Sequence, residues 1–524
     1  MKACLIQSNP VMGDIQTNFN WIKKQIISND ADIYVAPELA LIGYPPDDLL
    51  FDKEFIKKQE LAFSDFQPFL KNKLLIIGGV VLKKNKIFNS AFIISHNNIK
   101  HQHKQCLPNY GVFDEKRYFS AGDNQKIISY KNKKILILIC EDFWDKDLEK
   151  KYLDKQIDFC IVINASPFEI NKLNVRINRA KKINKKIKSN LIYLNMVGGQ
   201  DDVVFDGASF LLNKNNNISC QLNHFKCQTK LIEESSPEKI IKPLSIEGSV
   251  LNACILGTKD YIKKNQIKNV FIGLSGGIDY ALVAYIASKA INKKNINCIM
   301  MRSQYTSKMS IDDAKKLAKS LEVNFIDRNL SSLINQINLN LKDDFKNFPT
   351  DITEENIQAR IRGLILMAMA NKKNGIVLST SNKSESAVGY STLYGDMVGA
   401  YAPIKDVPKT LIYKISEFIN LTDNIIPERI INRPPSAELK PDQTDQDSLP
   451  TYEELDKIIE LFIDEGQSTD EIVSLGFKSQ TVKKIVKLIL KSEFKRRQSP
   501  PGPKITRKAF GRERRFPITN NYLG

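Results

Sequence analysis

Residues 270–279 read Val270-Phe271-Ile272-Gly273-Leu274-Ser275-Gly276-Gly277-Ile278-Asp279, and this stretch decides the fold of the second half of the chain. An apolar run typical of a buried strand leads into a Ser-Gly-Gly turn, and an apolar helical pattern follows over residues 281–287. Glycine lets a backbone approach an anion closely, and the first turn of a helix directs its N–H groups toward the same charge. The turn therefore predicts a pyrophosphate site, with an ordinary tight strand-to-helix connection as the alternative.

A Walker-type phosphate loop is excluded, because its Gly-x-x-x-x-Gly-Lys-Ser/Thr pattern cannot be drawn through this turn. The turn instead resembles the PP-loop of the ATP pyrophosphatases, which cleave ATP to AMP and pyrophosphate. The family pattern ends in Ser, whereas this chain has Tyr280. We expect the Tyr280 side chain to turn away from the phosphates, so that the backbone N–H groups of the loop bind them.

The length and composition indicate a globular protein of more than one domain. The chain has 524 residues, which exceeds what one core usually organises, and 42% of them are hydrophobic. No apolar run reaches the roughly 18 residues that cross a bilayer, and residues 1–6 lack the apolar core of a signal peptide. We therefore expect a cytoplasmic protein without a membrane partner. The eight cysteines form no Cys-x-x-Cys pair, so neither a disulfide framework nor a zinc site is predicted.

The formal charge of +18 raises the hypothesis of a nucleic-acid partner. Most of the Lys and Arg residues are scattered among Ile and Asn, as in residues 291–297, and this pattern is typical of solvated faces. The exception is the tail, residues 495–515, where basic residues alternate with Pro and Gly. Such a tail suits an anionic substrate as well as RNA. Because no RNA-binding module is recognisable, we expect no nucleic-acid partner.

The first half of the chain, residues 1–245, is predicted to be one α/β domain. Short and nearly continuous apolar runs indicate buried strands at residues 3–7, 33–36, 74–78, 92–94, 135–139 and 159–163. Helical patterns lie between several of these strands, as at residues 18–28 and 174–189. A polar segment rich in Ser, Pro and Lys at residues 233–245 predicts the linker to the second domain.

The second half, residues 246–524, is predicted to be a doubly wound parallel sheet. Strands are expected at residues 269–274, 297–301 and 376–379, and helices at residues 248–264, 311–321 and 354–371. This alternation implies a parallel sheet, whose ligands bind beyond the carboxyl ends of the strands. The Ser-Gly-Gly turn falls at such an end.

Three residues of the first half have the types that covalent catalysis by a thiol requires. Cys140 directly follows the strand at residues 135–139, Glu38 follows the strand at residues 33–36, and Lys104 lies between these two. A thiol needs a base that deprotonates it, and a tetrahedral oxyanion needs a fixed positive charge or N–H donors. A buried structural cysteine is the alternative interpretation of Cys140.

These residues, in this order, resemble the Glu-Lys-Cys triad of the nitrilase superfamily, whose members hydrolyse carbon–nitrogen bonds through a thioester. The resemblance implies an α-β-β-α sandwich in which Glu38 is the general base, Lys104 stabilises the intermediate and Cys140 is the nucleophile. Glu115 matches the second glutamate of that family and would orient Lys104.

His101 and His103 alternate with Gln102 close to Lys104, so a catalytic dyad or a metal pair is one interpretation of the two histidines. No carboxylate lies at ligand spacing from them. A structural or solvent-facing role is therefore favoured.

A nitrilase-like amidase joined to a PP-loop ATPase resembles one family over nearly the whole chain, the glutamine-dependent NAD synthetases. The strings that carry this resemblance are residues 107–115, 164–168, 198–201, 305–307, 353–363, 382–385, 393–397 and 403–406. The resemblance implies that deamido-NAD, ATP and glutamine, or ammonium in place of glutamine, give NAD, AMP and pyrophosphate, with glutamate as the product of glutamine. It also implies Mg²⁺ bound with ATP, and a homo-oligomer.

The same resemblance assigns further residues by position. Glutamine would be held by Tyr110, Ser166 and Lys172, and ATP by the loop Gly273–Tyr280 together with Thr380. Deamido-NAD would be bound by Asn356, Glu385, Asp396, Lys409 and Lys504. Asp279 and Glu385 would be the magnesium ligands, because carboxylates are the hard oxygen donors that Mg²⁺ prefers.

Two other functions remain as alternatives to a synthetase. An amidotransferase that acts on RNA would show tight, salt-sensitive RNA binding. A non-catalytic homologue would have lost its reactive groups, but Glu38, Lys104 and Cys140 are all present.

Overall fold

The structure, a computed structural model, describes residues 1–123, 127–233, 241–434, 438–440 and 449–522. The chain forms two compact units, Met1–Pro243 and Leu244–Gly524. The boundary expected from the sequence follows residue 245, and part of the linker predicted before it lies outside the described residues.

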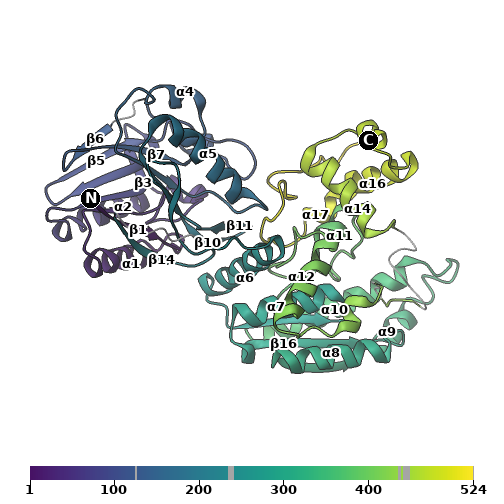
Figure 1. The fold of residues 1–524 in the computed structure, drawn as a ribbon. Coiled ribbons are helices and arrows are strands. Elements are labelled where there is room, and N and C mark those ends of the chain that lie inside the picture. Colours follow the sequence, from purple (N-terminus) through teal and green to yellow (C-terminus); the bar gives the residue numbers. More distant parts are fainter. Residues whose placement is uncertain (124–126, 234–240, 435–437, 441–448, 523–524) are drawn as a thin grey trace. The chain divides into compact units, whose positions relative to one another are not determined.

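The first unit contains two six-stranded sheets (Figure 1), with strand orders β14-β1-β2-β3-β4-β5 and β13-β12-β9-β8-β7-β6. The first sheet consists of β1 (Lys2–Gln7), β2 (Ile33–Val35), β3 (Leu74–Lys83), β4 (Lys86–Ser95), β5 (Asn98–His103) and β14 (Gln228–Glu233). The second consists of β6 (Ile127–Tyr130), β7 (Lys133–Ile139), β8 (Phe159–Asn164), β9 (Asn190–Asn195), β12 (Phe210–Leu212) and β13 (Ile218–Gln221). A separate antiparallel pair is formed by β10 (Val197–Gln200) and β11 (Val203–Asp206). The central strands β1, β2 and β3 are parallel to one another, as are β7, β8 and β9.

Helices cover the outer face of each sheet. The α-helices of this unit are α1 (Ile15–Ser28), α2 (Lys53–Ser64), α3 (Glu115–Tyr118), α4 (Lys146–Lys150) and α5 (Lys172–Ile187), and the 3₁₀ helices are η1 (Asp47–Phe51), η2 (Gln67–Phe69) and η3 (Cys140–Phe143). One apolar core joins the inner faces of the two sheets, with Leu5 and Val35 from one and Ile137 and Ile161 from the other. Two further cores pack α1 and α2 on the first sheet and α5 on the second. These layers confirm the predicted α-β-β-α sandwich.

The second unit contains a four-stranded parallel sheet of order β17-β16-β15-β18. Its strands are β15 (Asn269–Leu274), β16 (Ile296–Arg302), β17 (Asn324–Asn329) and β18 (Gly375–Val377). The chain winds from β15 outward to β17 and then returns to the other side of β15 as β18, so the strand order reverses between β15 and β18. Ligands of open α/β sheets bind at such a reversal. This sheet confirms the predicted doubly wound parallel fold.

The helices of the second unit fall into two groups. Those that accompany the sheet are α6 (Ile246–Lys264), α7 (Ile278–Ala290), α8 (Lys308–Leu321), α9 (Ser331–Asn340), α10 (Ile352–Lys372), α11 (Lys383–Val388), α12 (Lys409–Thr422) and α13 (Glu428–Asn432), with the short 3₁₀ helix η4 (Lys293–Asn295). The others are α14 (Tyr452–Ile459), the π-helical turn η6 (Glu460–Glu465), α15 (Thr469–Ser474), α16 (Ser479–Lys491) and α17 (Glu493–Arg496). The α14–α16 segment builds its own apolar core, which also takes in Phe510 and Phe516 of the tail. This helical cluster was not predicted from the sequence.

The loop that carries Glu38 crosses the backbone of β3 at very close distance. Residues 37–40 run directly over β3, where the Gly78 N–H donates to the Pro37 carbonyl at 3.0 Å. A methyl group on Gly78 would lie 2.4 Å from the Glu38 Cα atom, which is far inside contact distance. Glycine is therefore required here so that the loop that carries Glu38 can pass the strand.

We predict that Gly78→Ala destabilises the first unit by about 1–3 kcal/mol, since the added methyl group must displace backbone atoms. Calorimetric melting would show the loss as a lower unfolding temperature. The matched control is Gly248→Ala, whose new methyl group would meet its nearest neighbours at an ordinary 3.4 Å. Equal melting temperatures for the Gly78 variant and the native chain would contradict the argument.

Candidate active sites

A buried lysine bridges two buried glutamates in the first unit. The Lys104 Nζ atom donates to Glu38 Oε1 at 2.8 Å and to Glu115 Oε1 at 2.7 Å. Their side chains expose at most 3% of their surface. Removing three charges from water is costly unless each is paired, and here one ammonium serves two carboxylates. Glu38, Lys104 and Glu115 are thus brought together as the sequence analysis expects.

Electrostatics sets the protonation of this cluster. Burial lowers the pKa of Lys104, but Glu115 and Glu38 outweigh burial and hold that pKa well above its ordinary value. Burial raises the pKa of Glu115 to about 7, and the Lys104 charge opposes that rise. Tyr44, which the sequence analysis missed, donates its hydroxyl to Glu115 Oε1 at 2.8 Å. The neighbouring carboxylates therefore favour a protonated Lys104, and burial brings the pKa of Glu115 close to neutrality.

Cys140 begins η3 directly after β7 and is 4% exposed. Its backbone has a φ of 45°, a left-handed conformation that costs a non-glycine residue roughly 1–2 kcal/mol. Burial, followed by the neighbouring Glu38 charge, raises the pKa of the Cys140 thiol well above its ordinary value. The resting thiol is therefore protonated, and a thiol must lose its proton to a base before it acts as a nucleophile.

A third carboxylate, which was not predicted from the sequence, connects the lysine segment with the cysteine turn. Asp142 accepts hydrogen bonds from the backbone N–H groups of Gln105 at 2.9 Å and Cys106 at 2.8 Å. It also accepts from the Ile139 N–H at 3.3 Å. Residues 104–106 and 139–142 are thereby held against each other, which fixes Lys104 relative to Cys140.

Two of the residues expected to hold glutamine, Tyr110 and Ser166, hydrogen-bond to charged side chains of the first unit. Tyr110 is exposed and donates its hydroxyl to Glu141, the residue after the nucleophile, at 2.8 Å. Burial raises the pKa of Glu141, while Tyr110 and Lys172 act in the opposite direction. Ser166 is buried, and its hydroxyl accepts from the fully buried Arg176 at 3.1 Å. Glu141 and Arg176 were not predicted, because an isolated acidic or basic residue has no distinctive pattern.

The two histidines lie on β5, an edge strand, where they have structural neighbours. His103 Nδ1 is 2.8 Å from the Ser90 hydroxyl, and its ring stacks on Phe88 with centroids 4.2 Å apart. Among the described residues, no group of three or more His, Cys, Asp or Glu side chains is arranged to hold a metal ion.

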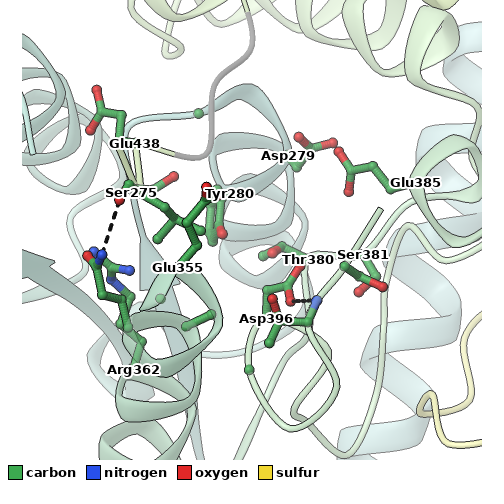
Figure 2. A pocket seen from close by; sticks show the side chains of 18 of the residues that line it. Ser275, Asp279, Tyr280, Glu355, Arg362, Thr380, Ser381, Glu385, Asp396 and Glu438 are labelled. Carbon is green, nitrogen blue, oxygen red and sulfur yellow. Dashed lines mark hydrogen bonds between the residues drawn. The ribbon is translucent and has the colours of Figure 1, made fainter. Parts of the chain in front are cut away.

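A cavity of about 740 Å³ opens in the second unit beside the carboxyl ends of β15 and β18 (Figure 2). It is lined by all eight residues of the phosphate loop, Gly273–Tyr280, and by Asn356, Thr380, Glu385, Asp396 and Lys409. The structure therefore gathers every residue predicted for the second site except Lys504. The cavity lies where the strand order reverses, as expected for a doubly wound sheet.

Asp279 and Glu385 point toward one another in Figure 2. Lys409 contacts both carboxylates, reaching Glu385 Oε1 at 3.1 Å, and Asn382 donates its amide to Asp279 Oδ1 at 2.9 Å. The two carboxylates thus share one positively charged neighbour, the Lys409 ammonium. Mg²⁺ is usually held by one or two carboxylates together with substrate phosphates, so the residues present fit this ion.

The expectation that Tyr280 turns away from the phosphate loop is wrong. A methyl group on Gly277 would lie 3.5 Å from a ring carbon of Tyr280, so the ring lies over the loop. The reason is that side chains of an α-helix point toward its N-terminus, and Tyr280 is in the first turn of α7. Tyr280 accordingly lines the cavity, and burial raises the pKa of its phenol to about 12.

Other cavity residues add charge and polarity. Asp396 accepts from the Thr392 N–H at 2.6 Å, and burial raises the pKa of this carboxyl to about 6. Asn356 accepts from the Thr392 hydroxyl at 2.7 Å. Arg362 of α10, missed by the sequence analysis, also lines the cavity, and burial lowers the pKa of its guanidinium. A cation in this position suits an anionic ligand.

The structure places Lys504 in the tail, where its ammonium binds within the tail itself. It donates to the carbonyls of Thr506 at 2.7 Å and Arg507 at 3.2 Å, and it lies 3.4 Å from Glu513. Lys504 does not line the cavity. Its contact with deamido-NAD stays a prediction from the resemblance.

A buried lysine ties the tail to the start of α11. The Lys383 ammonium contacts Asp464 at 3.0 Å, the Thr506 hydroxyl, and the Lys508 carbonyl at 3.0 Å. Lys383 is the first residue of α11, the helix that carries Glu385. The residue before it, Asn382, contacts Asp279. The tail therefore supports the part of the cavity that holds the two carboxylates.

Comparison with known proteins defines the class of both units. Residues 2–232 match the carbon-nitrogen hydrolase family, and residues 250–499 match the NAD synthase family. None of the helices in the described part of the chain is long and apolar enough to span a membrane.

Full-length relatives identify the family. The chain is 40% identical over 538 residues to the glutamine-dependent NAD(+) synthetase of Acinetobacter baylyi, covering 99% of this chain and 98% of the relative. It is 38% identical over 572 residues to that of Thermotoga maritima, covering 100% and 99%. The solved structure of glutamine-dependent NAD+ synthetase from Acinetobacter baumannii in complex with ADP matches with a TM-score of 0.80 and 37% identity, covering 99% of this chain and 98% of that one. The chain belongs to the family of glutamine-dependent NAD(+) synthetases.

The titration of Glu115 predicts a specific effect of pH on stability. Its pKa rises from 4.5 to about 7 on folding, so the folded state retains a proton that the unfolded chain releases. The contribution of Glu115 to stability is therefore complete below pH 4.5 and is lost as the pH rises through 7. As the pH rises from 4.5 to 7, the melting temperature of the native chain should therefore decrease relative to that of Glu115→Gln. A difference between the two proteins that stays constant or grows with pH would contradict this prediction.

Proposed function

We propose that this chain converts deamido-NAD to NAD, with ATP as the activating co-substrate and glutamine as the nitrogen donor. The observation that carries the proposal is the presence of two complete sites in one chain of this family. A buried Glu-Lys-Cys cluster lies in the first unit, and a phosphate loop beside paired carboxylates lies in the second. The other products would be AMP, pyrophosphate and glutamate.

In the first unit, Glu38 takes the thiol proton of Cys140, and the sulfur attacks the carboxamide carbon of glutamine. The oxyanion that forms is stabilised by the Lys104 ammonium, which Glu38 and Glu115 hold in place. Glu38 returns the proton to the departing nitrogen, so that ammonia leaves and a thioester remains. Water activated by Glu38 then hydrolyses the thioester and releases glutamate.

In the second unit, an oxygen of the nicotinate carboxylate attacks the α-phosphorus of ATP, and pyrophosphate leaves. The backbone N–H groups at the start of α7 bind the phosphates, and Lys409 and Arg362 supply positive charge. Asp279 and Glu385 would hold Mg²⁺, which neutralises phosphate charge when it is bound. Ammonia attacks the acyl carbon of the adenylate, and AMP leaves. Activation is needed because a free carboxylate is a poor acyl donor to an amine.

We further propose that the protein is a homo-oligomer. Apolar side chains of α10 face outward, with Ile352 65%, Leu364 66% and Met367 39% exposed. Exposed apolar residues gathered on one element suit contact with another copy of the chain.

The direct test is incubation with deamido-NAD, glutamine, ATP and Mg²⁺, followed by separation of the nucleotides. The proposal requires NAD and AMP in equal amounts. Formation of ADP, or the absence of NAD, would overturn it. The RNA amidotransferase is favoured instead if RNA binds tightly and in a salt-sensitive manner.

Replacement of the nucleophile separates the two half-reactions. We expect Cys140→Ala to lower glutamine-driven NAD formation by about 10³-fold or more, because the sulfur forms the covalent intermediate. Ammonium-driven NAD formation should stay unchanged. Cys160→Ala is the matched control, since Cys160 is a free, buried cysteine of the neighbouring strand β8. Loss of both activities in the Cys140 variant alone would refute independent sites.

The phosphate site is tested by Asp279→Asn, which keeps the shape of the side chain and removes its charge. We expect NAD formation to fall by about 10²-fold with either nitrogen source, because both routes use the same adenylation. Asp423→Asn is the control, since Asp423 pairs with Lys289 and Tyr285 at the far end of α7. Ammonium-driven turnover at the native rate would remove Asp279 from the metal site.

A further inference from the structure

Within the described part of the chain, fixed donors fill three of the four acceptor positions of the Glu38 carboxylate. Oε1 accepts from the Lys104 ammonium and from the Asn89 side-chain amide, each at 2.8 Å. Oε2 accepts from the backbone N–H of Ala165 at 2.9 Å. An ionised carboxylate has about four lone-pair positions, so one position remains, and it is on Oε2.

Asn89 is an unusual residue for its place in the fold. It lies within β4 and is fully buried, although Asn is depleted in strands. Its Nδ2 atom binds Glu38, while its buried Oδ1 atom has no hydrogen-bond partner among the described residues. An unsatisfied buried acceptor costs roughly 1–3 kcal/mol, so the residue is retained at the expense of stability.

The same residue also contacts Lys104. The backbone carbonyl of Asn89 accepts from the Lys104 N–H at 2.8 Å, and its side chain donates to Glu38. Asn89 is therefore connected to both partners of the central ion pair. The orientation of its amide is fixed, because a flipped amide would place Oδ1 against the Glu38 carboxylate.

We propose that Asn89 is a positioning residue that fixes the rotation of the Glu38 carboxylate, so that the free lone pair of Oε2 receives the Cys140 proton. This inference rests on the proposed role of Glu38 as the base. Lys104 and Asn89 together occupy Oε1, and the Ala165 N–H leaves Oε2 with a single vacant direction. The S–H bond of Cys140 breaks as an O–H bond forms at Oε2, and the same proton later leaves with ammonia.

Removal of the amide should misdirect the base without affecting glutamine binding. We expect Asn89→Ala to lower the kcat of glutamine hydrolysis by about 10–100-fold, the loss that a small misplacement of a catalytic group produces. The KM for glutamine should change by less than about threefold. The rate of Cys140 alkylation by iodoacetamide should fall in parallel, and ammonium-driven NAD formation should be unchanged.

The pH dependence of glutamine hydrolysis by Asn89→Asp distinguishes a positioning role of Asn89 from a purely structural one. A protonated Asp retains an O–H donor toward Glu38, whereas an ionised Asp repels it. The ratio of the Asn89→Asp rate to the native rate should therefore rise as the pH falls, while the ratio for Asn89→Ala stays flat. If Asn89→Ala does not fold, this pH dependence decides the question. A ratio for Asn89→Asp that is independent of pH overturns the proposal.

Gln59→Ala is the matched control for the loss of a buried amide. Gln59 is fully buried, and its amide serves only the backbone of Val80, with Nε2 donating at 2.9 Å and Oε1 accepting at 3.1 Å. Val80 pairs with Asn89 across the sheet, so both variants disturb the same region. An equal loss of glutamine hydrolysis in the Gln59 variant, or native kcat in Asn89→Ala, overturns the proposal.

Parallel assays of Glu38→Gln and Cys140→Ala separate this inference from the proposed function. If both of those variants keep glutamine hydrolysis, the assignment of the base and the nucleophile fails. If both lose it while Asn89→Ala retains the native kcat, only the positioning role fails.

Discussion

The first unit depends on a charge imbalance, in which one ammonium is shared between two buried carboxylates. Lys104 pairs with both Glu38 and Glu115, so the cluster carries an excess negative charge whenever both acids are ionised. Such a cluster weakens a fold, since burial of charge is rarely recovered in full by pairing. It is useful to an enzyme because the lysine cannot lose its proton, while a carboxylate beside a buried thiol can gain one. The surrounding sheets hold these groups in place.

The second unit has to bind a polyanion, and it does so with backbone N–H groups and cationic side chains. Its ligand is a polyanion, so the loop presents backbone N–H groups at the start of α7 rather than a single strong cation. Lys409 pairs with both Asp279 and Glu385. Arg362 of α10 adds a further positive charge to the cavity lining. The two sites thus share one arrangement, a buried lysine that contacts two carboxylates.

The sequence predicted those features that depend on local pattern. Strand ends located Glu38 and Cys140, because each of the two residues follows an apolar run that marks a buried strand. Local patterns do not predict contacts between residues that are far apart in the sequence. An example is the hydrogen bond from Asn89 to Glu38, which lie 51 positions apart. The left-handed backbone of Cys140 also has no local signal. The error at Tyr280 was avoidable, since the direction of helical side chains follows from geometry alone.

The anchoring of the tail by Lys383 bears on how the chain is made. The first unit, which ends at Pro243, can complete its sheets while the rest is still being synthesised. The second site cannot, because Thr506 and Lys508 hold the segment that positions Asp279 and Glu385. The ribosome must therefore add the residues up to Lys508 before the segment that begins with Lys383 gains these contacts. A chain that stops before Thr506 would keep its carbon-nitrogen hydrolase unit but lack the contacts that support the second site.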